Sequence, residues 1–151
     1  MLTLLANPQF KIYAVCCVIL SFQMLVLGAM TAAKRANRKN YLNPEDVKVA
    51  FKEAKLIEGA EHPDVARVIR AHRNLNESLP MFFALGLLLV LVGASPLGVN
   101  ICLGVFTGAR ILHSIVYVNE AQPWRTMFFA IGSFSLIGMM VQIVLSVLAA
   151  A

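Results

Sequence analysis

The chain has 151 residues, of which 59% are hydrophobic and 14% charged, and its formal net charge is +5 at pH 7. Soluble domains contain about 45–50% apolar and about 25% charged residues, whereas the mean hydropathy of this chain is +0.74. This composition excludes an ordinary soluble globular protein, a disordered chain, a collagen and a disulfide-stapled secreted module. The length suits one domain over residues 1–151, and the composition indicates a membrane protein.

Three stretches carry no charged residue: residues 12–33, 78–109 and 126–151. A membrane-spanning helix needs about 20 apolar residues, so the first and third stretches each hold one span. Gly93-Ala94-Ser95-Pro96 divides the middle stretch, because Gly ends helices, Ser caps them and Pro suits the first helical position. The sequence therefore predicts an all-α membrane bundle of four helices, over about residues 10–34, 64–93, 96–119 and 123–149.

The second predicted helix must begin before residue 78, because residues 79–93 alone are too short to cross a membrane. It therefore carries several ionisable side chains, namely Arg67, Arg70, His72, Arg73 and Glu77, and the third helix carries Arg110 and His113 near its end. Ionisable groups at membrane depth are costly and usually face a bundle interior or a water-filled cavity. These residues are the first indication of a functional site.

Basic residues predict the orientation of the chain in the membrane. Seven of them lie between the first two predicted helices: Lys34, Arg35, Arg38, Lys39, Lys48, Lys52 and Lys55. The positive-inside rule places this connection and the 118–125 connection in the cytoplasm, with both termini outside. The N-terminus lacks the basic region and cleavage site of a signal peptide, so the first span is expected to be retained. The expected location is the bacterial inner membrane or the endoplasmic reticulum, with no nucleic-acid partner, because the chain has no soluble basic face.

The connection between the first two helices contains a helix-start pattern. Asn43-Pro44-Glu45-Asp46 offers an N-cap, a first-turn proline and acidic residues at the positive end of the helix dipole. Val47, Phe51 and Ala54 follow at helical spacing, which predicts a short amphipathic helix in solvent or at the membrane surface.

All three cysteines, Cys16, Cys17 and Cys102, fall inside predicted spans. They have no metal-ligand spacing, so no metal site is expected. A thiol buried in an apolar region forms little thiolate, which disfavours a catalytic cysteine. The simplest interpretation is that the cysteines are small buried apolar residues.

Helical spacing groups the polar residues into faces. Arg70, Arg73, Asn74 and Glu77 share one face of the second helix, and Arg110, His113 and Tyr117 share one face of the third. Arg35 ends the first helix and Arg125 opens the fourth at the same membrane height. Arginine binds carboxylates and phosphates through paired donors, so the sequence predicts a site for a small anionic molecule at the membrane boundary. A simpler interpretation is polar contact within the bundle, with Arg67, Lys34 and Lys39 extending to lipid headgroups.

The motifs resemble those of one known family. Asn43-Pro44-Glu45-Asp46, then Arg70-Ala71-His72-Arg73-Asn74 with Glu77 and Pro80, then Gly108-Ala109-Arg110 with His113 and Tyr117, are similar to the MAPEG family, the membrane-associated proteins in eicosanoid and glutathione metabolism. The resemblance extends from about residue 34 to 130. Its nearest branches are the microsomal glutathione transferases and the microsomal prostaglandin E synthases.

The resemblance implies a homotrimer that binds glutathione between subunits near the cytoplasmic face, with a lipophilic second substrate arriving from the bilayer. The glutathione-binding positions implied by the family are Arg35, Arg70, His72, Arg73, Asn74, Glu77, Arg110, His113 and Tyr117, followed by Arg125. Arg73 is similar to the synthase branch, whereas Gln122-Pro123 is more similar to the transferase branch. The synthase branch has a serine where Thr126 lies and a tyrosine where Phe129 lies, which weakens an isomerase interpretation.

The function expected on this basis is a glutathione transferase of the microsomal type, which activates the glutathione thiol for attack on lipophilic electrophiles. The same thiolate could attack lipid hydroperoxides, which would give the enzyme peroxidase activity. Arg125 is expected to stabilise the thiolate, with Thr126 nearby and Asp46 orienting Arg125 through an ion pair. The alternatives are an isomerase like prostaglandin E synthase, a non-catalytic lipid-binding protein, and a small transporter. The transporter ranks last, because residues 78–109 contain few polar side chains.

Overall fold

The computed structural model describes residues 2–50, 54–57 and 59–150. Four long helices form the bundle: α2 (Pro8–Arg38), α4 (Pro63–Leu91), α5 (Pro96–Val118) and α6 (Trp124–Ala149). A short helix, α1 (Leu2–Ala6), precedes them, and the connection from α2 to α4 contains β1 (Asn40–Tyr41), α3 (Pro44–Val49) and β2 (Lys55–Leu56). The predicted four-helix bundle is confirmed, and all four long helices are long and apolar enough to cross a membrane.

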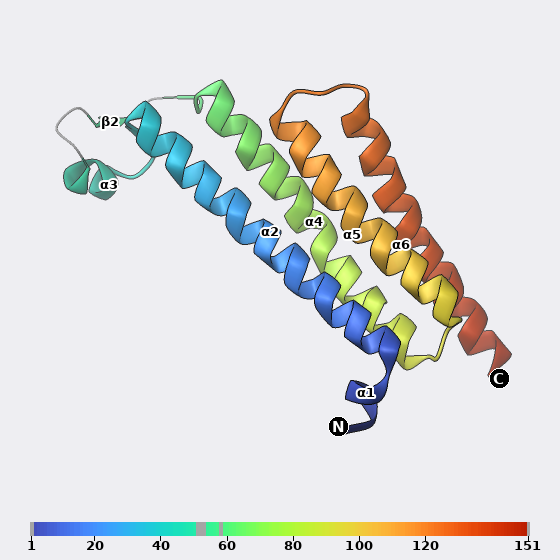
Figure 1. The fold of residues 1–151 in the computed structure, drawn as a ribbon. Helices are drawn as coiled ribbons and strands as arrows, with labels where there is room; N and C mark the ends of the chain where they lie inside the picture. Colours follow the sequence, from blue (N-terminus) through green and yellow to red (C-terminus); the bar gives the residue numbers. More distant parts are fainter. Residues whose placement is uncertain (1, 51–53, 58, 151) are drawn as a thin grey trace.

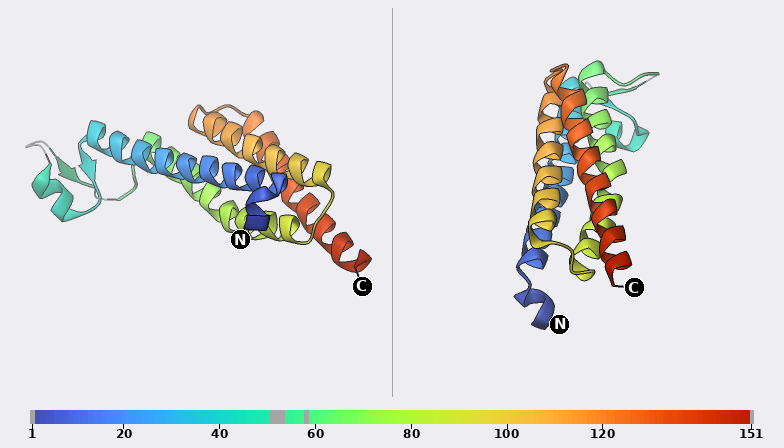
Figure 2. Two further views of the ribbon diagram at one scale, coloured as in Figure 1. Left: turned by 60° about the horizontal axis from the view of Figure 1, so that its bottom comes forward. Right: turned by 90° about the vertical axis from the view of Figure 1, so that its right-hand side faces the viewer.

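The long helices run side by side, and both chain termini lie at the same end (Figures 1 and 2). α2 packs against α4 and α5, and α6 packs against α5 and α4. The core between them contains Leu20, Phe82, Leu103 and Phe106, all fully buried, and the rings of Phe82 and Phe106 stack with centroids 4.5 Å apart. Large apolar side chains such as Phe22 and Phe134 are exposed on the outer faces, as expected for helices surrounded by lipid.

The turn between α4 and α5 forms where the sequence predicts it. Gly93 has a φ of +65°, a left-handed conformation that glycine adopts without steric cost. Ser95 is the N-cap of α5 and Pro96 is its first residue. These local signals therefore separate the 78–109 stretch into two helices.

The α2–α4 connection differs from its prediction. Asn43 is the N-cap of α3, but its Nδ2 donates to Asp46 Oδ2 at 3.0 Å instead of its side chain capping the backbone. The helix was expected to include Phe51 and Ala54, yet it ends at Val49, and Phe51 lies outside the described residues. Ala50 has an extended backbone conformation, and β2 pairs in parallel with β1. A helix of six residues is only weakly stable by itself, so the pairing of the two strands outweighs any extension of α3.

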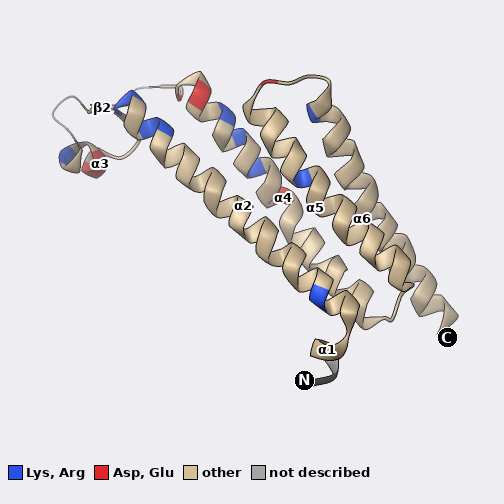
Figure 3. Ribbon diagram, in the orientation of Figure 1, with Lys and Arg blue, Asp and Glu red and all other residues tan. Residues whose placement is uncertain are grey.

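Charged residues gather at one end of the bundle, which carries α3, the two strands, the start of α4 and the α5–α6 connection (Figure 3). We call this the basic end. Ion pairs join its segments: Arg35 of α2 with Glu61, Arg38 of α2 with Asp64, and Arg67 of α4 with Glu120. These pairs fix the ends of the helices relative to one another around the candidate site.

Candidate active site

A small pocket of about 230 Å³ opens between α4, α5 and α6 near the basic end. We call it the polar pocket, and it is lined by Asn74 of α4, His113 and Tyr117 of α5, and Arg125, Thr126 and Phe129 of α6. Five of these six residues were singled out from the sequence. The helical spacing that grouped them on separate helices therefore places them around a common space in a single chain.

Arg125 is held in the first turn of α6, at the wall of the polar pocket. Its guanidinium carbon lies 4.8 Å from the centre of the Tyr117 ring, which is a cation–π contact. With the amide of Gln122 oriented to satisfy both of its groups, its oxygen accepts from Arg125 Nε at 3.0 Å and its nitrogen donates to Thr126 Oγ1 at 3.3 Å. Gln122 and Tyr117 thus fix the direction of Arg125 without neutralising its charge.

Arg110 lies directly behind the polar pocket and is only 2% exposed. Its Nη1 donates to Asn74 Oδ1 at 3.1 Å, and its guanidinium carbon lies 5.3 Å from the Phe106 ring centre and 5.2 Å from that of Phe129. Its Nε is buried and has no hydrogen-bond partner among the described residues. Because its partners are an amide and two aromatic faces, Arg110 keeps positive charge beneath the pocket.

His113 is also buried, at the inner wall of the polar pocket. Its ring meets the Tyr117 ring edge-on with centroids 5.5 Å apart, and the Phe129 ring lies 6.0 Å away. Phe129 thus contacts His113 and Arg110 from α6, which makes it part of the wall. The sequence indicated Phe129 only through its departure from the family pattern.

Arg73 and Glu77 lie on the surface of α4 rather than in the polar pocket. Arg73 Nε donates to Glu77 Oε1 at 3.0 Å, and the two side chains are 78% and 60% exposed. Arg70, one turn earlier, is exposed as well. These charged groups share α4 with Asn74, so a ligand that extends out of the pocket along α4 would meet them.

Arg35 and Asp46 line a different cavity, which has a volume of about 390 Å³ and also contacts Tyr41. Arg35 Nε donates to Glu61 Oε1 at 2.8 Å, an acid that the sequence analysis did not single out. Within one chain, the structure therefore does not bring Asp46 to Arg125, and the expected ion pair between them is absent from the described contacts.

His72 faces away from the polar pocket. Its Cε1 lies 3.9 Å from the position that a β-carbon on Gly28 of α2 would occupy. In one chain His72 therefore packs between α4 and α2, a structural position rather than one on the pocket wall.

Two polar partners, Glu120 and Glu61, were missed from the sequence, and Gln122 was noted only for its similarity to the transferase branch, not as a contact of Arg125. Gln122 lies three and four residues before Arg125 and Thr126, a spacing that brings side chains together in a helical turn. Glu120 and Glu61 contact residues 53 and 26 positions away, Arg67 and Arg35, and no local pattern reports such contacts.

Comparison with known proteins identifies the family of the chain. A model of the MAPEG family matches residues 13–145. Microsomal glutathione S-transferase 1 of Homo sapiens is 35% identical over 129 residues, which cover 83% of each chain. Prostaglandin E synthase of Mus musculus is 31% identical over 132 residues, 87% of this chain and 84% of that protein, and the synthase of Bos taurus is 28% identical over 144 residues, 95% and 92% respectively. The chain thus belongs to the MAPEG family.

Proposed function

We propose that this protein is an integral membrane enzyme that activates the thiol of glutathione for attack on lipophilic electrophiles. The observation that carries the proposal is the direction of Arg125: the Tyr117 ring and Gln122 hold its guanidinium at the wall of the polar pocket. The names of the relatives, a glutathione transferase and prostaglandin E synthases, support the same class of reaction.

The residues around the pocket suit glutathione, a small peptide with two carboxylates, one amine and one thiol. Arg73 and Arg70 offer cations for the carboxylates, and Glu77 offers an acceptor for the amine. Asn74, His113 and Tyr117 supply neutral polar groups that can fix the peptide between the charged surface and the pocket. The buried charge of Arg110 has no acidic partner among the described residues, so it favours an anion in the pocket in front of it.

Arg125 has the central role in the proposed mechanism. A free thiol has a pKa of about 8.5, and a neighbouring cation lowers that value, so more of the reactive thiolate is present at neutral pH. Arg125 would stabilise the thiolate, with the Thr126 hydroxyl as a further donor. The thiol proton passes to solvent at the membrane boundary, so no covalent intermediate with the protein is required.

The acceptor side of the site is apolar. Phe129 lines the pocket, and Trp124 and Phe128 stack beside it at the start of α6 with ring centroids 6.4 Å apart. An electrophile dissolved in the bilayer would approach over these rings. In the transfer step a bond forms between glutathione sulfur and the electrophilic carbon, and the bond to the leaving group breaks. With a lipid hydroperoxide, the thiolate would attack the outer oxygen, the O–O bond would break, and the alkoxide would leave and take a proton from solvent. The resulting glutathione sulfenic acid would then react with a second glutathione to give glutathione disulfide and water, which completes the peroxidase alternative.

A second candidate is isomerisation like that of prostaglandin E synthase, which the named synthases favour. Phe129 carries no hydroxyl where that branch is expected to have a tyrosine, so we place this activity second. A non-catalytic lipid-binding protein is the third candidate. The fixed orientation of Arg125 argues against it, because a binding protein has no need of a positioned cation beside a thiol.

We also infer that the protein works as a homotrimer with its basic end in the cytoplasm. Arg35 and Asp46 line a separate cavity in one chain, yet the family resemblance includes Arg35 in the glutathione site. A neighbouring subunit that presents its α2 and α3 beside α4 and α6 would bring both residues to the pocket. Arg73 and Glu77 are charged and exposed on a membrane helix, where contact with lipid is costly, so they too need either water or a neighbouring subunit beside them.

Turnover of glutathione with a chromogenic aryl halide, measured in detergent, tests the proposal. The wild-type protein and a Lys11→Ala control, which removes a cation near the opposite end of α2, should both be active. No turnover with this electrophile or with a lipid hydroperoxide, in protein shown to be folded, would contradict an enzymatic function.

A further inference from the structure

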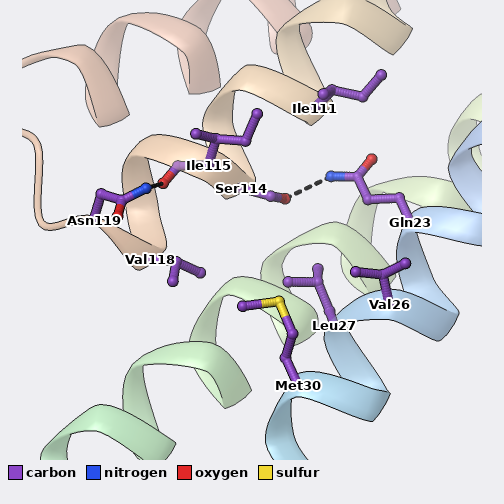
Figure 4. Close-up of a pocket in the computed structure, with 9 residues that line it drawn as sticks. All are labelled: Gln23, Val26, Leu27, Met30, Ile111, Ser114, Ile115, Val118 and Asn119. Atoms are coloured by element: carbon purple, nitrogen blue, oxygen red, sulfur yellow. Dashed lines mark hydrogen bonds between the residues drawn. The ribbon is translucent and has the colours of Figure 1, made fainter.

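Two cavities outside the polar pocket have opposite chemical character. One is an apolar groove of about 220 Å³ between α2 and α5, where Gln23 Nε2 donates to Ser114 Oγ at 2.7 Å (Figure 4). None of the residues that line this groove in the described part of the chain is charged. The other has a volume of about 390 Å³, and we call it the cationic pocket because of its lining: Arg38, Lys39, Asn40 and Lys55.

The backbone builds the cationic pocket from two segments that are distant in the sequence. α2 ends at Arg38, and Lys39 follows in a left-handed conformation with a φ of +54°, which turns the chain out of the helix into β1. The backbone N–H of Lys55 donates to the backbone oxygen of Lys39 at 2.8 Å, and the parallel register places Lys55 of β2 beside Asn40 of β1. Backbone hydrogen bonds therefore hold these residues together, although three of them carry like charges.

The charge of the cationic pocket is not fully neutralised within the chain. Arg38 pairs with Asp64 through Nη2, which leaves other N–H donors of the guanidinium for a ligand. Lys55 forms no ion pair within the described part of the chain. The negative end of a helix dipole favours cations at the end of α2, but this does not account for Lys55, which comes from β2.

The cationic pocket lies near the level of the lipid headgroups. The charge-free stretch of α2 ends at residue 33, so Arg38 lies about 8 Å of helix beyond it. The headgroup layer extends about 5–8 Å beyond the hydrocarbon core on each side. Leu42, Val49 and Leu56 expose apolar side chains on the same connection, and apolar side chains beside cations are typical of segments that contact anionic membranes.

We propose that the cationic pocket binds a phosphate group, carried either by an anionic phospholipid or by free phosphate. Lysine and arginine are the usual partners of phosphate in proteins. The Lys55 ammonium and the N–H groups of Arg38 that Asp64 does not use would donate to the phosphate oxygens, with the Asn40 amide as a further donor. The negative charge of the phosphate offsets the repulsion among cations that the backbone holds close. None of these residues lines the polar pocket, so the proposal does not rest on the proposed function.

Native mass spectrometry of the full-length protein in an uncharged detergent tests the site with phosphatidic acid, whose headgroup is a phosphate alone. The protein should retain this lipid about tenfold more tightly than phosphatidylcholine with the same acyl chains, because only phosphatidic acid carries a net negative charge. Lys55→Gln should weaken its binding about tenfold, since one charged hydrogen bond is lost, whereas Lys55→Arg keeps the charge and should bind like the wild type.

Lys48→Gln is the matched control for Lys55→Gln. It removes the same charge from the same connection, at an exposed position that does not line the cationic pocket, and it should leave the binding of phosphatidic acid unchanged. Equal losses in the two variants would overturn the proposal, because general attraction of lipid to a basic segment requires no pocket.

Inorganic phosphate distinguishes the two sources of the phosphate group. Equilibrium dialysis at constant ionic strength measures its binding to the wild type and to the same two variants. Saturable binding that Lys55→Gln loses and Lys48→Gln keeps would support a site for free phosphate. Retention of phosphatidic acid through Lys55 without such binding would assign the site to a lipid. If neither ligand depends on Lys55, the proposal is overturned.

Glutathione separates the cationic pocket from the proposed active site. Excess glutathione should not displace phosphatidic acid, and displacement would overturn a separate phosphate site. Glutathione turnover by Lys55→Gln should match the wild type. The backbone hydrogen bond of Lys55 does not involve its side chain, so thermal unfolding midpoints should also match, which confirms folding. An enzyme without turnover that still binds phosphate through Lys55 leaves this proposal intact, and an active enzyme without phosphate binding contradicts this proposal alone.

Discussion

Two arginines of the candidate site occupy opposite environments, and their environments suggest different roles. Arg110 is buried, with Asn74 and two aromatic rings as its contacts. Since it does not line the pocket, we propose that it orients Asn74 and supplies positive charge behind the pocket. Arg125 lines the pocket itself, where its guanidinium can meet a ligand atom.

Replacement of Arg125 by Ala should lower turnover far more than it lowers glutathione affinity. Hydrogen bonds to charged groups contribute about 1.5–3 kcal/mol, so a loss of thiolate stabilisation of that size reduces turnover roughly tenfold to a hundredfold. Steady-state kinetics and equilibrium dialysis of Arg125→Ala and the Lys11→Ala control measure both quantities. A variant that loses binding and turnover in equal proportion would assign Arg125 to peptide binding instead.

The surface pair on α4 should have the opposite effect. Arg73→Ala and Glu77→Ala remove contacts proposed for the ends of glutathione, and a charged hydrogen bond of about 1.5–3 kcal/mol implies roughly a tenfold loss of affinity or more. The rate at saturating glutathione should change little. Equilibrium dialysis checks this expectation, and wild-type affinity in both variants would exclude this face of α4 from the glutathione site.

At the scale of the helices, the close approach of α4 to α2 depends on one glycine. A β-carbon at Gly86 would lie 2.9 Å from ring carbons of Tyr13 and 3.2 Å from Leu103 Cδ2. Tyr13 cannot move freely, because its hydroxyl donates to the backbone oxygen of Phe83 at 2.9 Å. The residue that packs best here is thus the smallest one, as is common where membrane helices meet.

Gly86→Ala should therefore destabilise the bundle by about 1–3 kcal/mol, the usual cost of an overpacked core position. Gly104→Ala is the matched control, since a β-carbon there has no atom within 4 Å and alanine favours helix by up to about 1 kcal/mol. Thermal unfolding in detergent should show a lower midpoint for Gly86→Ala and an equal or higher one for Gly104→Ala. Equal midpoints for the two variants would mean that α2 and α4 are not packed this closely.

The sequence predicts the long helices well, because their signals are local. Charge-free stretches locate the spans, and Gly93 with Pro96 locates the α4–α5 turn. The α2–α4 connection was predicted less well, since α3 ends early where β2 pairs with β1. Such pairing depends on contacts between segments distant in the chain, which helical periodicity does not report.

The site shows the same division between local and distant information. Helical spacing placed His113 and Tyr117 on one face of their helix, and the predicted topology placed Asn74 and Arg125 at the same membrane depth. In the structure all four side chains line one pocket. It did not indicate that Arg110 is buried behind them, or that His72 turns toward α2. Packing between helices decides which neighbour each face of a helix contacts, and the sequence pattern of one helix does not reveal this.

At the scale of the whole molecule, the basic end and the apolar remainder suit a protein embedded in a membrane with its site at one surface. The pair Arg73–Glu77 is exposed, and Arg35 lines a separate cavity, as the proposed sharing of the site between subunits leads us to expect. The proposed trimer explains both features, because a neighbouring α2 would cover the charged face of α4.

A mixing experiment tests this sharing. If α2 of one subunit and α6 of the next build one site, trimers mixed from Arg35→Ala and Arg125→Ala chains should regain activity at interfaces where both wild-type faces meet. Native mass spectrometry in detergent counts the subunits and verifies the mixture. A monomer that binds glutathione fully, or verified mixed trimers without any recovery, would refute a shared site.

The central claim is that Arg125 lowers the thiol pKa of bound glutathione, and the ultraviolet absorbance of the thiolate reports it directly. Glutathione is titrated at neutral pH into the wild-type protein and into Arg125→Gln, which keeps hydrogen-bonding capacity but removes the charge. The account predicts a saturable thiolate signal in the wild type and a much smaller one in the variant, while equilibrium dialysis shows glutathione bound to both. A signal of equal size in the variant, or none in the saturated wild type, would contradict thiol activation by Arg125.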